Sequence, residues 1–89
     1  MKKRYLDVTF HKGKPLAAYY YLPRITGEKS VRTEKAGAGF LIDYGQSGRP
    51  IGIEITAPES ISRRTINEIL DKLNLNPAQK EGLAPLLAA

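Results

Sequence analysis

The stretch that decides the fold of this chain is GFLIDYGQSGRPIGIEI, residues 39–55. Two runs in which apolar and polar residues alternate flank the turn-forming segment GQSGRP, residues 45–50, and this arrangement is typical of a β-hairpin. If Tyr44 lies opposite Ile51, the register gives the hairpin one strongly apolar face that belongs to the core. That face carries Phe40, Ile42, Tyr44, Ile51, Ile53 and Ile55.

A second hairpin is expected ahead of this one. Residues 5–10 alternate as a strand does, and residues 16–22 form a β-favouring run. The segment HKGKP, residues 11–15, contains Gly and Pro and is interpreted as a five-residue hairpin loop. Residues 24–35 are polar and turn-prone, so we expect a solvated connection there, with a short strand near residues 31–33 as the alternative.

An amphipathic helix is predicted over residues 62–75. Ser62 is the expected N-cap, and Asn74 is expected to end the helix in a left-handed conformation. One apolar stripe with helical spacing can pack on the sheet, and it consists of Ile66, Ile69, Leu70 and Leu73. The predicted fold class is therefore α+β: a small antiparallel, meander-like sheet of three to five strands with one C-terminal amphipathic helix packed on a face.

A chain of 89 residues has room for one core, so residues 1–75 are expected to form a single domain and residues 76–89 a C-terminal tail. The tail carries a cluster of leucines, Leu83, Leu86 and Leu87, and we expect it either to dock on the domain or to bind a partner. Because a sheet this small leaves unpaired edges, we also expect a homodimer or a small protein partner.

The net charge of +5 is concentrated in the first part of the chain. Residues 1–35 contain nine Lys or Arg and three acids, whereas residues 36–89 contain five and six. A basic segment of this kind either binds nucleic acid or forms a solvated surface. The candidate nucleic-acid contacts are Lys12, Lys14, Arg24 and Arg32.

The chain contains no cysteine, which excludes a disulfide framework, a thiolate metal site and a thiol nucleophile, and which fits a reducing cytoplasm. No export signal and no run of membrane-spanning length are visible. We therefore expect a cytoplasmic protein without a membrane partner.

Few side chains offer catalytic chemistry. The single histidine, His11, has no second metal ligand at a suitable spacing. Asp43 and Glu54 lie diagonally on one face of the predicted hairpin, where two acids can share a proton or an ion, although acids on the outer face of a half-buried hairpin normally only keep that face hydrated. We expect no catalytic, cofactor or metal site, and a hydrolase or metal enzyme that uses Asp43 and Glu54 is the least favoured alternative.

Three consecutive tyrosines, Tyr19, Tyr20 and Tyr21, stand on a predicted strand near several cations. Such a group can form a platform that stacks single-stranded bases. Strand alternation, however, places Tyr20 on the face opposite to Tyr19 and Tyr21, so core packing on one side and an amphipathic outer surface on the other explain all three.

Residues 39–55 resemble the hairpin signature "V-L-x-D-Y-D-x-x-G-x-x-x-G-I-E-I" of the uncharacterised bacterial domain-of-unknown-function family numbered 2283. The matching residues are Asp43, Tyr44, Gly48, Gly52, Ile53, Glu54 and Ile55. Residues 17–22 are similar to the "D-A-L-Y-I-x-L" strand of that family, but Leu16 stands where the family shows an acid. The resemblance covers residues 4–57 and implies a sheet-rich module, and an association of relatives with small toxin-like proteins implies an antitoxin- or inhibitor-like role.

The function that these observations favour is a non-enzymatic protein-interaction module. Aromatic and large apolar side chains dominate binding energy at interfaces, so the expected anchors are Tyr19, Tyr20, Tyr21, Leu83, Leu86 and Leu87. The alternative is a nucleic-acid-binding domain that uses the basic N-terminal half.

Overall fold

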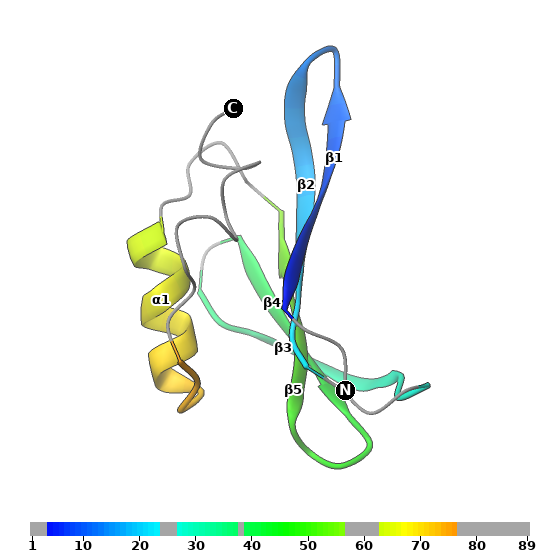
Figure 1. Ribbon diagram of the computed structural model, residues 1–89, viewed down its shortest axis with the longest axis vertical. Coiled ribbons are helices and arrows are strands. Elements are labelled where there is room, and N and C mark those ends of the chain that lie inside the picture. Colours follow the sequence, from blue (N-terminus) through cyan, green and yellow to red (C-terminus); the bar gives the residue numbers. More distant parts are fainter. Residues whose placement is uncertain (1–3, 24–26, 38, 57–62, 77–89) are drawn as a thin grey trace.

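The computed structural model describes residues 4–23, 27–37, 39–56 and 63–76. Its five antiparallel strands form one sheet in the order β1-β2-β5-β4-β3, and one helix packs on that sheet (Figure 1). The predicted α+β fold is confirmed. The elements are β1 (Tyr5–His11), β2 (Lys14–Tyr21), β3 (Ser30–Lys35), β4 (Phe40–Gly45), β5 (Pro50–Ile55) and α1 (Arg63–Lys72).

The sheet joins a hairpin, β1–β2, to a three-stranded meander, β3–β4–β5. The central strand β5 pairs with β4 on one side and with β2 on the other. The chain therefore passes from β2 to the far edge of the sheet before it returns through β4 to the centre.

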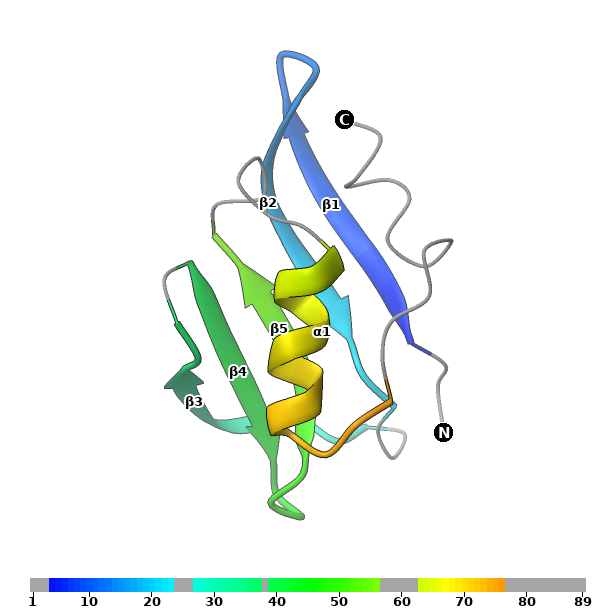
Figure 2. The same cartoon turned by 90° about the vertical axis from the view of Figure 1, so that its left-hand side faces the viewer.

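Helix α1 lies across one face of the sheet, in front of β5 in the view of Figure 2. The predicted apolar stripe packs there, with Ile66 and Leu70 fully buried. Burial of a side chain of this size contributes about 1.5–3 kcal/mol. The core that results combines strand and helix residues: Ala18, Tyr20, Leu22, Phe40, Ile42, Ile53, Ile55, Ile66, Ile69 and Leu70.

The helix ends as the sequence predicts. Asn74 adopts a left-handed φ of 59°. Its N–H donates to the Asp71 carbonyl at 3.0 Å, and the Leu75 N–H donates to the Leu70 carbonyl at 2.8 Å. This pair of bonds is the Schellman arrangement, which satisfies carbonyls that the helix end leaves unpaired. The predicted N-cap, Ser62, lies outside the described residues.

The predicted register of the β4–β5 hairpin is correct in the middle of the hairpin and wrong at its turn. Ile42 pairs with Ile53 as expected, but Tyr44 pairs with Pro50 instead of Ile51, because the register shifts between Asp43 and Tyr44. Tyr44 is therefore only partly buried, at the margin of the core.

The predicted five-residue loop between β1 and β2 is also wrong. Lys12 and Gly13 alone make the turn, with φ values of 52° and 78°. Two successive positive φ values are typical of the type I′ turn, whose twist matches that of the flanking strands. A bulge follows, since Thr9 pairs with Ala17 but Phe10 pairs with Pro15.

The short strand near residues 31–33, the alternative expectation, is present and longer than expected, since residues 30–35 form β3; the favoured expectation of a solvated connection is wrong there. This strand lies at the edge of the sheet, and all six of its residues are exposed. Both of its faces carry polar side chains, so the alternation that reveals a half-buried strand is absent.

Beyond the pair that Ala18 makes with Ile55, no strand among the described residues lies beside the β1–β2 hairpin as a third strand. Residues 10–16 therefore pair only with one another and form a projecting arm, which extends past the other strands in Figure 1. Two large apolar side chains on this arm are exposed, Phe10 by 50% and Leu16 by 58%. In the described part of the chain, no helix has the length and apolar character that crossing a membrane requires.

Candidate protein-binding face

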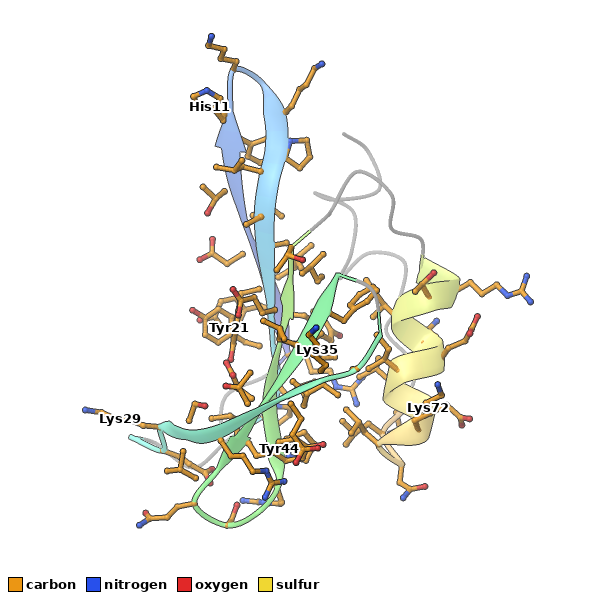
Figure 3. All side chains as sticks on the ribbon, turned by 180° about the vertical axis from the view of Figure 1, so that it is seen from behind. His11, Tyr21, Lys29, Lys35, Tyr44 and Lys72 are labelled. Atoms are coloured by element: carbon orange, nitrogen blue, oxygen red, sulfur yellow. The ribbon has the colours of Figure 1, made fainter. Side chains whose placement is uncertain are left out.

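Helix α1 covers one face of the sheet, and no described element covers the opposite face, which we call the open face. Figure 3 shows Tyr21 on the side of the sheet away from α1. The strand registers align the open-face residues in rows across the five strands. They are Tyr5 and Asp7 on β1, Tyr19 and Tyr21 on β2, Gly52 and Glu54 on β5, Leu41 and Asp43 on β4, and Thr33 and Lys35 on β3.

Three tyrosines form a cluster on the open face. The rings of Tyr5 and Tyr21 stack with centroids 4.3 Å apart and planes 11° apart. Tyr19 meets Tyr21 edge to face at 4.6 Å. Tyr5 lies at the outside of the cluster and is 45% exposed. Tyr20, by contrast, is 3% exposed and packs in the core, so it does not belong to the open face and is not accessible to a partner.

Asp43 connects strands on both sides of β5. The Tyr19 hydroxyl donates a hydrogen bond to one carboxylate oxygen of Asp43 at 2.7 Å. The Thr33 hydroxyl donates to the other oxygen at 2.6 Å. Both oxygens of Asp43 are therefore engaged in holding β2, β4 and β3 together.

Gly52 makes the hydrogen bond between Tyr19 and Asp43 possible, which crosses β5. It lies on β5, directly between Tyr21 of β2 and Asp43 of β4. A Cβ atom at this position would collide with the ring and hydroxyl of Tyr19. Glycine therefore leaves the space that the Tyr19 side chain needs to cross β5. Sequence reasoning singled out Asp43 and Gly52 but missed their common contact with Tyr19.

Asp43 and Glu54 lie diagonally on the same face, as predicted, because Asp43 pairs with Gly52 and Leu41 pairs with Glu54. Only Asp43 is held by hydrogen bonds. Among the described residues, neither Glu54 nor Asp7 has a side-chain hydrogen bond or ion pair. The same part of the chain contains no group of three His, Cys, Asp or Glu that is arranged to hold a metal ion. Two unpaired carboxylates thus flank the tyrosine cluster.

The structure separates the predicted nucleic-acid contacts. Lys12 and Lys14 lie at the end of the arm, next to His11. Arg32 lies on β3 at the opposite edge of the sheet, where its guanidinium carbon is 4.3 Å from the centre of the Tyr44 ring. Its Nε is 2.8 Å from the Glu34 carboxylate. These cations do not form one patch.

The predicted residues Arg24, Leu83, Leu86 and Leu87 lie outside the described part of the chain.

The β4–β5 turn depends on an acid that sequence reasoning missed. The Ser47 hydroxyl donates to Glu28 Oε2 at 2.9 Å, although the two residues are 19 positions apart. The Glu28 carboxylate occupies the space that a side chain on Gly45 would need. Gly48 supplies the positive φ of the turn, 88°. No local pattern links Glu28 to this turn, because β3 and β4 separate them in the chain.

Comparison with known proteins finds no matching family model, no similar curated protein and no similar solved structure. The family resemblance of residues 39–55 stays a prediction.

Proposed function

We propose that this domain is a protein-interaction module that binds its partner through the open face. The observation that carries the proposal is the partly exposed tyrosine cluster on the face opposite α1, with Tyr5 45% exposed and stacked on Tyr21. Tyrosine is enriched among the residues that contribute most to binding at interfaces, because it buries a large rigid ring at a low cost in conformational entropy.

The rigidity of the cluster supports this role. Tyr19 contacts Tyr21 and is tied to Asp43, so the rings are held in place before a partner arrives. A surface that is already ordered loses less conformational entropy on binding. The unpaired carboxylates of Asp7 and Glu54 beside the rings favour a partner with cationic side chains.

The hydrolase alternative is less well supported. A catalytic pair needs one acid that is free to exchange a proton with a substrate. Asp43 instead accepts hydrogen bonds from Tyr19 and Thr33 through both of its oxygens. An antitoxin- or inhibitor-like role remains compatible with the proposal and would require the open face to cover the working surface of a small protein.

The nucleic-acid alternative rests mainly on Lys12 and Lys14 at the end of the arm. Two cations neutralise at most two phosphates, so the logarithm of the binding constant would fall with the logarithm of salt concentration with a slope of only about −1.8. We therefore expect no saturable binding of a labelled oligonucleotide at physiological salt. Tight binding with a steep salt dependence would favour the nucleic-acid function instead.

Affinity capture from the native cell tests the proposal. Three baits are compared: the native chain, a variant with Tyr5→Ser and Tyr21→Ser on the open face, and a control with Arg64→Ala on the solvent side of α1. We expect the native and control baits to retain a partner protein that the open-face variant loses. A differently tagged copy of the chain itself counts as such a partner. Identical capture by all three baits would refute the role of the open face. Urea unfolding of each bait verifies that it is folded.

A further inference from the structure

We infer that the open face binds the arm of a second copy of this chain. This inference rests on the proposed function and names its partner. It follows from the arm and the open face, two surfaces that have complementary charge and that lie apart within one molecule.

The arm is cationic and partly apolar. Lys12 and Lys14 flank Gly13 at its end, and neither side chain has a hydrogen-bond or ion-pair partner among the described residues. The sequence from Val8 to Gly27 contains no Asp or Glu, so no acid of the arm offsets these charges. By strand alternation Phe10 lies with Leu6 and Val8 on the α1 side of the hairpin, so the contact of the arm with an open face rests on its charges.

The open face has the opposite character. Among the open-face residues defined above, the acids are Asp7, Asp43 and Glu54, and the only cation is Lys35 at the β3 edge. The chain as a whole carries a net charge of +5, so this face is an acidic exception on a basic protein. Its tyrosine rings offer cation–π contacts to lysine.

The arm cannot reach the open face of its own molecule. It continues β1 and β2 in the direction of the strands and leads away from the tyrosine cluster. Along β2, Lys14 is five residues from Tyr19, a separation of roughly 17 Å in an extended strand. A paired hairpin does not fold back on itself over that distance, so a second molecule must provide the acceptor face.

A two-fold axis allows each copy to place its arm on the other copy and to receive the other copy's arm on its own open face. If two sheets face each other with their strands antiparallel, each arm lies over the tyrosine cluster of the other copy, because the arm and the cluster are separated by the same distance in both. Such an interface is closed, and each contact occurs twice. Lys12 and Lys14 of one copy then face Asp7 and Glu54 of the other.

Charge reversal in sedimentation equilibrium tests this arrangement. We expect the native chain to sediment at about twice the monomer mass of 9.8 kDa. Lys12→Glu with Lys14→Glu on the arm should weaken dimerisation at least about tenfold, and Asp7→Lys with Glu54→Lys on the open face should do the same. A matched control with Arg64→Glu and Lys72→Glu makes the same charge change as the arm variant on α1, on the other side of the sheet (Figure 3), and it should dimerise as the native chain does.

Mixing the two reversed variants gives the decisive result. The arm variant is acidic on its arm and its face, whereas the face variant is basic on both, so a one-to-one mixture should restore a dimer that neither variant forms alone. Failure of the mixture to dimerise overturns the inference, as does a native chain that is monomeric at all concentrations. If the native chain is monomeric but affinity capture still depends on Tyr5 and Tyr21, the inference fails while the proposed function stands. The milder variant Lys12→Gln with Lys14→Gln provides the same comparison if a reversed variant does not fold.

Discussion

The hydrogen bond of Tyr19 to Asp43, which crosses Gly52, gives Asp43 and Gly52 a structural role, although in the sequence they resemble a functional site. An acid beside a glycine on an exposed hairpin face invites a catalytic or binding interpretation. In the folded protein, Asp43 accepts hydrogen bonds from two neighbouring strands, and Gly52 provides the space for one of them. These residues order the open face, and the tyrosines and unpaired acids around them form the surface that we propose binds a partner.

Replacement of Gly52 by alanine tests this contact. The new Cβ forces the Tyr19 ring away and breaks its bond to Asp43, so we expect Gly52→Ala to lower the free energy of unfolding by about 1–3 kcal/mol. In a Tyr19→Ala background the same change should cost nearly nothing, because the obstruction is gone and alanine is a better strand residue than glycine. Urea unfolding of the four chains measures the coupling, and equal costs in both backgrounds would disprove the contact.

The three adjacent tyrosines should differ sharply in their contribution to stability. Tyr20 is 3% exposed in the core, so Tyr20→Ala is expected to cost about 3–5 kcal/mol, as large core truncations do. Tyr21→Ala removes ring contacts on the open face and should cost about 1 kcal/mol. Urea denaturation distinguishes the two variants, and a similar loss in both would contradict the division of the tyrosines between core and open face.

The elements that sequence reasoning predicted well are those whose signals are local. Alternation around residues 45–50 and the apolar stripe from Ile66 to Leu73 each lie within one short segment. The edge strand β3 has no such signal, since both of its faces are solvated and its pairing with β4 supplies the structure. The pairing of β2 with β5 was not predictable for a related reason, because it depends on how two hairpins meet and not on either alone.

The helix terminus offers a sensitive test of one local prediction. Asn74 has a left-handed φ of 59° within a Schellman arrangement. We expect Asn74→Ala to cost about 1 kcal/mol, because a Cβ atom without a compensating polar group is strained in that conformation. Asn74→Gly should leave stability within about 0.5 kcal/mol of the native value. If alanine and glycine have equal effects in urea unfolding, the helix does not end in this conformation.

The arm should be dispensable for folding. We propose to replace residues 10–16 by Asn-Gly, which closes a two-residue turn between Thr9 and Ala17, a pair that already lies in register. The replaced residues lie outside the core, so the melting midpoint should change by only a few degrees. Circular dichroism and thermal melting check this expectation. Loss of the folded state would show that the arm belongs to the domain core.

The described part of the molecule has two edge strands and one open face as possible sites of contact with another molecule, and the side chains on each distinguish between them. Every residue of β3 is exposed, and Arg32, Glu34 and Lys35 place charges along that edge. Charged edges discourage pairing with another sheet. The open face, with stacked rings beside unpaired acids, has the features of an interface.

Part of this face was predictable from the sequence. Alternation alone places Tyr19 with Tyr21, and the hairpin register places Asp43 diagonal to Glu54. The expected loop over residues 11–15 also places Tyr5 opposite Tyr21, because the observed bulge compensates for the shorter turn at Lys12 and Gly13. The register alone does not give the stacked arrangement of the two rings, which depends on the rotamers of the side chains.

Cross-linking between arm and open face examines the proposed assembly without altering its charges. The chain has no cysteine, so His11→Cys on the arm and Leu41→Cys beside Glu54 introduce single thiols in separate chains. A one-to-one mixture treated with a short bis-maleimide is predicted to give a covalent heterodimer in high yield, whereas His11→Cys mixed with Glu68→Cys on the exposed side of α1 gives little. Equal yields from the two mixtures, or no covalent dimer from either, would contradict an arm bound to the open face of a second copy.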